Sequence, residues 1–156
     1  MALLVSAGLL LLVVAGTHGS GAATSGGPDV GFPCTDATIR GTYGIQMQGT
    51  GPVPPPVGGT QTLIGVVRRT YDGMGNFTQT DNIHGSVTGW VPDRPGSGTY
   101  QVNANCTAAT QFQPGPAAPL IEERIVIVDG GNELDSVTTS PLSLMVSTVG
   151  KRIDPR

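Results

Sequence analysis

The chain contains few charged and few aromatic residues. Charged residues make up 12% of its 156 positions, and Phe, Trp and Tyr together make up 4%. Soluble domains carry about 25% charged residues, so long charged helices and coiled coils are not expected here. Eight Lys and Arg against eleven Asp and Glu give a net charge of −3. Because no basic patch is visible either, we expect no nucleic-acid partner.

Histidine and cysteine are also scarce, which limits the chemistry available to the chain. After residue 23, His84 is the one histidine, and Cys34 and Cys106 are the two cysteines. Zinc sites need three or four His, Cys or carboxylate ligands, so we expect no metal, and no other cofactor is indicated. The G-x-S-x-G motif of serine hydrolases is missing, and we expect His84 to be solvated in a turn. The sequence therefore favours a protein that is not an enzyme, without deciding the question.

The longest apolar run lies at the N-terminus. Thirteen of residues 1–15 are apolar, and fifteen helical residues span about 22 Å, short of the roughly 30 Å of a bilayer core. Small residues follow at 16–23, as in the cleavage region of a secretory signal peptide. We predict a signal peptide at 1–23, a flexible segment at 24–33 and a single domain at 34–156; a retained membrane anchor is the alternative. The mature protein would be secreted or periplasmic, without stable membrane insertion.

The two cysteines agree with export. In an oxidising compartment, Cys34 and Cys106 most simply pair with each other. Closing a loop of this length would stabilise the fold by about 4 kcal/mol in the chain-entropy model. A metal-binding or nucleophilic thiol is the alternative.

The body of the chain alternates apolar and polar residues with a period of two, which is typical of half-buried strands. Turn-forming sequences rich in Gly, Asn and Asp separate the segments, and 84–85 and 93–98 are further breaks. Eight short strands joined by hairpins predict an all-β, antiparallel up-and-down β-barrel, because closure removes exposed sheet edges; a β-sandwich is the alternative. The predicted strands are 42–48, 60–72, 76–84, 99–106, 107–113, 120–129, 133–140 and 142–152.

Residues 49–59, with the sequence GTGPVPPPVGG, do not fit a strand. Proline lacks the N–H that a sheet needs, so we predict a long surface loop with a stiff centre. Three interpretations remain open: a tolerated surface insertion, a lid over the barrel, or a ligand for a proline-recognition module.

Several motifs occur in a characteristic order. They are G-x-Y-G at 41–44, D-G-x-G-N at 72–76, G-T-Y-x-V-N-x-x-C-T at 98–107 and V-I-V-D-G-G at 126–131. In this order they resemble a group of small exported bacterial proteins over residues 34–152. The resemblance implies a barrel similar to calycins or to allene oxide cyclase, and it implies no particular function. Lipocalins begin with a G-x-W strand and end with a basic residue over that ring; Gly41-x-Tyr43 and Arg152 are weak counterparts.

Two pairs of adjacent charges lie inside predicted strands. Arg68 and Arg69 follow the apolar run 63–67, and Glu122 and Glu123 precede 125–128. Alternation directs one member of each pair to each wall of the barrel. Either an inward arginine meets an inward glutamate, or both charges lie near the rim in water. In the first case the arginine would anchor an anionic ligand.

The leading functional hypothesis is a small exported barrel that binds a small apolar or amphipathic ligand in its interior. A lipid cyclase or isomerase, and a structural or surface-interaction protein, are the alternatives. The candidate ligand-binding residues follow from strand parity and charge, with core packing as their alternative role. They are Tyr43, Ile45, Met47, Arg68, Arg69, Tyr100 and Val102.

Overall fold

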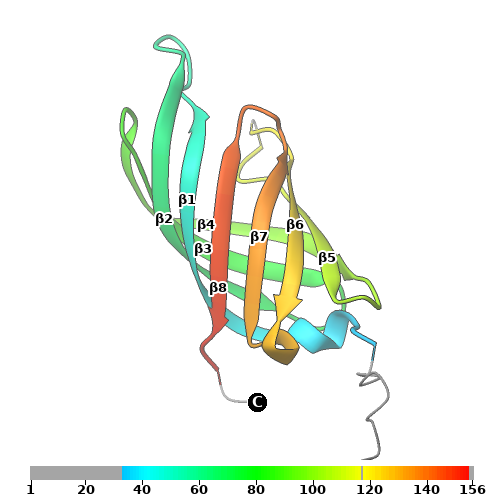
Figure 1. Ribbon diagram of the computed structural model, residues 1–156. Helices are drawn as coiled ribbons and strands as arrows, with labels where there is room; N and C mark the ends of the chain where they lie inside the picture. Colours follow the sequence, from blue (N-terminus) through cyan, green and yellow to red (C-terminus); the bar gives the residue numbers. More distant parts are fainter. Residues whose placement is uncertain (1–32, 117, 155–156) are drawn as a thin grey trace, which may run out of the picture. The chain divides into compact units, whose positions relative to one another are not determined.

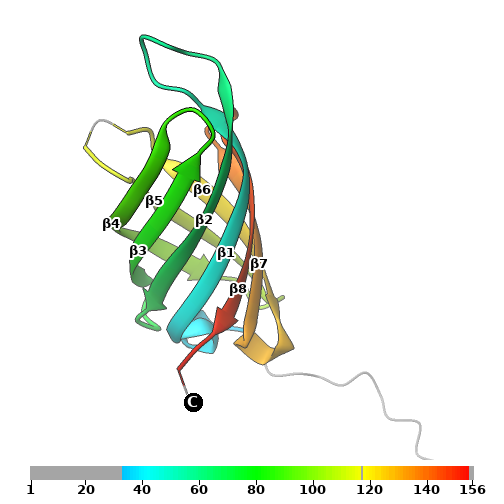
Figure 2. The same cartoon turned by 90° about the vertical axis from the view of Figure 1, so that its left-hand side faces the viewer.

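The computed structural model describes residues 33–116 and 118–154; the predicted signal peptide at 1–23 lies outside the described residues. Eight antiparallel strands follow one another around a closed barrel (Figures 1 and 2). The up-and-down barrel is therefore confirmed, and the sandwich alternative is wrong. Within the described ranges, no helix is long and apolar enough to cross a membrane.

The barrel closes because the first strand pairs with both the second and the last. The strands are β1 (Gly41–Pro52), β2 (Thr60–Tyr71), β3 (Asn76–Gly85), β4 (Gly89–Val102), β5 (Thr107–Phe112), β6 (Ile121–Val128), β7 (Glu133–Ser140) and β8 (Met145–Arg152). Two short 3-10 helices accompany them: η1 (Asp36–Ile39) before β1, and η2 (Asp129–Gly131) between β6 and β7.

The two ends of the barrel are built differently. The loops β1–β2, β3–β4, β5–β6 and β7–β8 lie together at one end, at the top of Figure 1, which we call the open end. The turns β2–β3 and β4–β5 and both 3-10 helices lie at the opposite end, which we call the plugged end. Each strand therefore runs from one chemical environment to the other.

The predicted boundary between the first strand and the Pro-rich loop was wrong. β1 continues through 49–52, where its residues pair with β2 as far as Pro52 with Thr60. A side chain at position 49 would clash with the Met145 carbonyl oxygen, so Gly49 is required by the close approach of two strands and not by a loop. The Pro-rich loop is correspondingly shorter, at 53–59.

Smaller errors are the predicted strand start at 142, where β8 begins at Met145, and the predicted break at 84–85, which belongs to β3. The larger errors concern β4. Residues 93–98 were predicted as a break, but they belong to β4. β5 pairs only with Gly98–Val102, so the first part of β4 has β3 as its single strand partner among the described residues, and prolines are tolerated on such an edge. Residues 103–106, predicted as strand, form the β4–β5 turn, where Cys106 adopts a positive φ of 61°.

Aromatic side chains fill the plugged end. Five of the seven aromatic residues of the chain gather there, in edge-to-face or tilted contacts with ring centroids 5.0–6.1 Å apart. Ile39 of η1 is fully buried against the same cluster and covers it at the plugged end of the barrel. Contacts of this kind stabilise beyond simple area burial. The five rings belong to Tyr43, Tyr71, Phe77, Tyr100 and Phe112.

A cation covers the first ring of this cluster. The guanidinium carbon of Arg152, in β8, lies 4.9 Å from the ring centroid of Tyr43. Arg152 Nη2 donates hydrogen bonds to the Tyr43 hydroxyl at 2.6 Å and to the Gly131 carbonyl at 2.8 Å. The first and last strands and η2 are thus fastened together at the plugged end.

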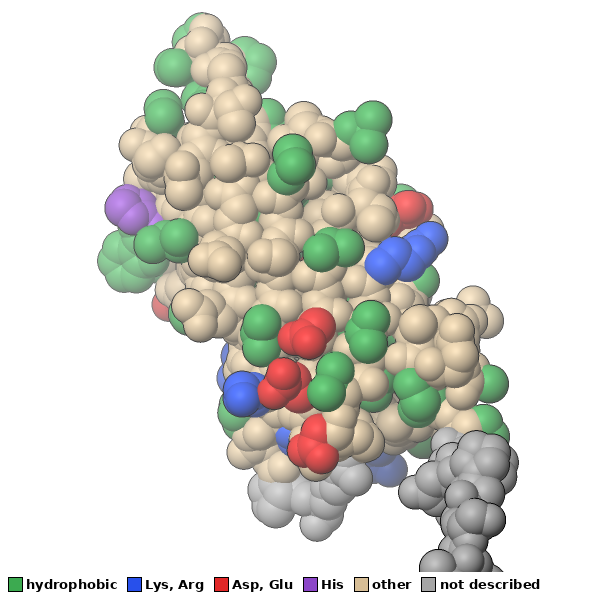
Figure 3. Space-filling view, in the orientation of Figure 1, with side chains coloured by type: hydrophobic (Ala, Val, Ile, Leu, Met, Phe, Trp, Pro, Cys, Tyr) green, Lys and Arg blue, Asp and Glu red, His purple; other side chains and the backbone are tan. Residues whose placement is uncertain are grey.

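The outer wall carries scattered apolar side chains. On the face shown in Figure 3, they are separated by side chains of other types. Trp90 has 68% of its surface exposed, beside exposed residues such as Ile64 and His84 on neighbouring strands. His84 is exposed, as predicted, but it lies in β3 and not in a turn.

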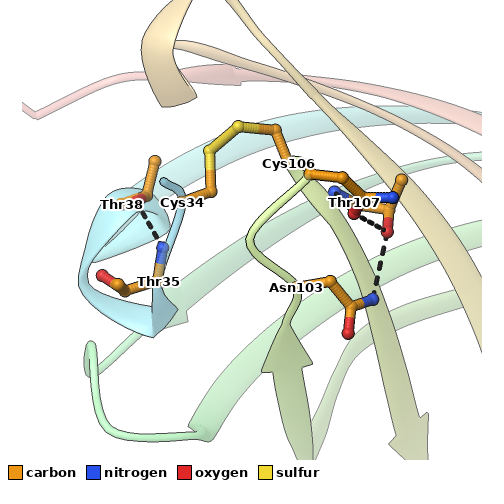
Figure 4. Close-up of a disulfide and its surroundings, with 7 residues drawn as sticks. Cys34, Thr35, Thr38, Asn103, Cys106 and Thr107 are labelled. Carbon is orange, nitrogen blue, oxygen red and sulfur yellow. Dashed lines mark hydrogen bonds between the residues drawn. A yellow bond between two sulfur atoms is a disulfide. The ribbon is translucent and has the colours of Figure 1, made fainter. Parts of the chain in front are cut away.

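The predicted disulfide is confirmed. Cys34, just before η1, bonds to Cys106 in the β4–β5 turn, with Cα atoms 5.0 Å apart (Figure 4). Hydrogen bonds stabilise the backbone on both sides of the disulfide. Beside Cys34, Thr35 N–H donates to Thr38 Oγ1 at 2.9 Å, and beside Cys106, Asn103 Nδ2 donates to Thr107 Oγ1 at 3.0 Å. The bond holds η1 on the plugged end, and disulfides are typical of oxidising compartments.

Candidate functional site

The open half of the barrel contains a cavity of about 390 Å³. This volume falls within the range of about 300–1,000 Å³ that is usual for small-molecule sites. Every strand contributes inward side chains to its lining, because alternate residues of each strand face the barrel interior. The apolar wall includes Ile45, Met47, Val67, Ile83, Ile121 and Val146.

Prolines surround the mouth of the cavity. Pro52 is the last residue of β1, and Pro54 lies in the loop that follows it. Pro114 and Pro119 come from the β5–β6 connection, and Pro141 from β7–β8. Because proline has a fixed φ, these segments lose little further freedom when the chain folds or when a ligand enters. Part of the predicted Pro-rich loop therefore lies at the entrance, and its action as a lid stays a prediction.

A buried ion pair forms the floor. Arg69 Nη1 lies 2.7 Å from Glu123 Oε2, and each side chain is only 6% exposed. Thr110 Oγ1 donates to the same carboxylate oxygen at 2.7 Å. The hypothesis that one inward arginine meets one inward glutamate is confirmed, and the alternative with both charges in water is wrong. Arg68 and Glu122 have the opposite parity and face the outer wall.

A chain of hydrogen bonds leads from this pair to the mouth. Arg69 Nε donates to Gln79 Oε1 at 2.8 Å, and Gln79 Nε2 donates to Asp81 Oδ2 at 3.2 Å. Arg94 then donates to both oxygens of Asp81, at 3.0 and 3.1 Å. The side chain of Arg94 is 33% exposed, so the polar chain begins in the buried floor on β6 and reaches solvent at β4.

The guanidinium of Arg69 packs on the aromatic cluster at the floor of the cavity. Its central carbon lies 4.4 Å from the ring centroid of Phe77 and 5.4 Å from that of Phe112. Burial acts to lower the pKa of Arg69, but Glu123 and Tyr71 together raise this pKa by more, so the group stays charged. Burial also raises the pKa of the Tyr71 phenol, against the opposing effect of Arg69, and Tyr71 stays neutral. The floor is therefore one fixed cation paired with one carboxylate.

The structure places the seven candidate residues in three environments. Ile45, Met47 and Arg69 line the cavity. Tyr43 and Tyr100 belong to the aromatic cluster at the plugged end, and Val102 packs against it. Arg68 lies on the outer wall.

Three residues of the hydrogen-bond chain were missed from the sequence. Gln79 and Asp81 alternate with Phe77 along β3, so the same parity argument would have directed them inward. Arg94 was missed because its segment, which belongs to β4, was predicted as a break between strands. In the described part of the chain, no three His, Cys, Asp or Glu residues are grouped so that they could hold a metal ion.

Comparison with known proteins adds no assignment to this site. No protein-family model, no curated protein and no solved structure matches the chain. A function must therefore be argued from the cavity, its floor and its mouth.

Proposed function

We propose that this protein is an exported barrel that binds a small amphipathic molecule in its open half. The observation that carries the proposal is the cavity of about 390 Å³, with an apolar wall and a polar floor. The apolar body of a ligand would contact Met47, Val67 and Ile83, and its polar group would reach Arg69 and Glu123. Burial of apolar surface would supply most of the affinity, and the floor would orient the ligand.

Export and the relationship to calycin-like barrels are parts of the same proposal. The disulfide supports an oxidising location, and the contact of Arg152 with Tyr43 supports the lipocalin correspondence. N-terminal sequencing of the protein recovered from the periplasm or medium tests export. A mature chain that begins at or near residue 24 is expected; an intact N-terminus in the cytoplasm would contradict it.

Binding can be tested by filling the cavity from one wall. Val67 lines the cavity and is 8% exposed, whereas its neighbour Val66 faces outward and is 60% exposed. With the fluorescent probe N-phenylnaphthylamine, Val67→Phe should weaken binding by about tenfold or more. Val66→Phe, which adds the same ring outside, should leave binding unchanged. Equal effects of both variants, or no binding by the wild type, would contradict the proposal.

A lipid cyclase or isomerase is a second candidate, favoured by one observation. The Arg69–Glu123 pair is a fixed polar cluster at the end of an apolar cavity, an arrangement that can hold a reactive molecule in one orientation. Extraction of a bound unsaturated lipid epoxide after incubation separates the two candidates. Recovery of the unchanged compound supports binding alone, and a rearranged isomer that Glu123→Gln no longer produces supports the enzyme.

A further inference from the structure

The charges that line the cavity cancel one another. Its charged lining residues are Arg69, Arg94, Asp81 and Glu123, two of each sign. They form two ion pairs, Arg69–Glu123 at 2.7 Å and Arg94–Asp81 at 3.0 Å. The inward arginine is therefore already neutralised before any ligand enters.

Two atoms of the floor nevertheless remain available for hydrogen bonds. Glu123 Oε2 accepts from both Arg69 Nη1 and Thr110, whereas Glu123 Oε1 and Arg69 Nη2 have no partner among the described residues. In that part of the chain, the one fully buried side-chain oxygen or nitrogen without a hydrogen-bond partner is Asp154 Oδ1, which lies 3.9 Å from Arg152 Nη1. The two floor atoms are therefore accessible from the cavity, one as a donor and the other as an acceptor.

This arrangement suits an uncharged head group better than an ion. A ligand carboxylate would lie beside Glu123 and Asp81, and a ligand ammonium would lie beside Arg69 and Arg94. Either ion would lose its hydration without finding an unpaired opposite charge in the cavity, which is unfavourable. A neutral group that both accepts and donates would satisfy Arg69 Nη2 and Glu123 Oε1 together. Primary amides and alcohols have this chemistry.

We infer that the cavity selects ligands with a neutral head group, an amide or an alcohol, on an apolar body. The inference rests on the proposed function, because it concerns the ligand of the same cavity. A neutral ligand thus takes the place of the anionic ligand predicted from the sequence for an inward arginine.

Four probes with the same chain length test the inference: octanamide, octanol, octanoate and octylammonium, titrated into the wild-type protein at neutral pH by calorimetry. Octanamide and octanol should bind about tenfold more tightly than either ion, or better. If either ion binds as tightly as the neutral probes, the inference fails while the proposed function stands. If no probe binds, the proposed function fails and the inference fails with it.

A matched pair of variants locates the selectivity. Glu123→Gln removes the negative partner of Arg69, so octanoate should gain about tenfold in affinity relative to octanamide. Glu122→Gln makes the same change one residue away on the outer wall, where Glu122 accepts a hydrogen bond from Gln111, and should keep the wild-type order. An unchanged order in Glu123→Gln would overturn the inference. If that variant does not fold, the wild-type order decides the question.

Discussion

The plugged end and the open end of this barrel use the same strands for opposite purposes. At the plugged end, five rings, Ile39 of η1, Arg152 and the disulfide leave the interior filled. At the open end, smaller aliphatic side chains and a rim of prolines surround a cavity. The Arg69–Glu123 layer lies between them. The filled part and the hollow part of the interior thus lie at different levels of one barrel.

A single strand shows how the sequence encodes these levels. From its end to its start, β2 places Tyr71 in the aromatic cluster, Arg69 in the charged layer, Val67 on the cavity wall and Gln61 near the mouth. Each of these residues is two or more positions from the next and faces inward. Side-chain size at inward positions therefore decides where the barrel is filled and where it is hollow.

The largest expected effect comes from breaking the charged layer between the two ends. Arg69→Met leaves Glu123 buried without its cation, and we expect a loss of about 3–5 kcal/mol in the free energy of unfolding. Arg68→Met removes an exposed charge on the next residue and should change stability by less than about 0.5 kcal/mol. Urea unfolding measures both variants. Small, equal losses would contradict a buried pair.

Removing the disulfide should weaken the plugged end by a similar amount. The bond spans 72 residues, so in the chain-entropy model the double variant Cys34→Ser/Cys106→Ser loses about 4 kcal/mol of stability. Because the bond lies at the far end from the cavity, affinity for N-phenylnaphthylamine should stay the same at temperatures where the variant is folded. If the double variant loses affinity for N-phenylnaphthylamine while its stability is unchanged, the disulfide supports the cavity and not the plugged end, which contradicts the account.

Isoleucines on the two sides of the charged layer compare the ends directly. Ile125 is 2% exposed in the core, and Ile83 lines the cavity. Ile125→Ala should cost about 2–4 kcal/mol because it opens a void in packed surroundings. Ile83→Ala only widens an existing space and should cost about 1 kcal/mol. Thermal unfolding of both variants checks the order, and equal losses would indicate that the open half is packed too.

The sequence predicted the barrel because its evidence is local. Alternation and glycine-bearing turns mark strands wherever they occur, and the cysteine pairing had one simple solution. Parity also gave two open interpretations of the paired charges, and the one in which an inward arginine meets an inward glutamate is confirmed for Arg69 and Glu123. The sequence could not tell which parity faces inward, because both faces of β2 carry apolar residues, such as Val66 and Val67.

The remaining errors have a long-range cause. Pro95 looks like a strand breaker, yet it is accommodated because β5 is too short to pair with the first part of β4. The hollow half also depends on side chains from all eight strands, so local patterns cannot reveal its volume. The seven aromatics of the chain could have been spread along the barrel; the concentration of five of them at one end appears only in the fold.

The smallest expected effect concerns a hairpin of the plugged end. Hydrogen bonds from Asn76 and from the Met74 backbone lower the pKa of Asp72 below its ordinary value. A carboxylate with a lowered folded pKa stabilises the fold above its unfolded pKa, about 3.9, and this contribution disappears as the pH falls through the folded pKa. Asp72→Asn should therefore slightly lower the melting temperature at neutral pH and flatten its acid dependence. Asp135→Asn, on the outer wall, controls for the loss of one charge, and an identical acid profile in wild type and Asp72→Asn would contradict the hairpin's role.

A crystal structure of the protein grown with octanamide would test the central claim most directly. The account predicts density for the alkyl chain along Met47 and Val67, with the amide within hydrogen-bond distance of Arg69 and Glu123. An open half filled by the protein's own side chains, or octanamide bound only to the outer wall, would contradict it.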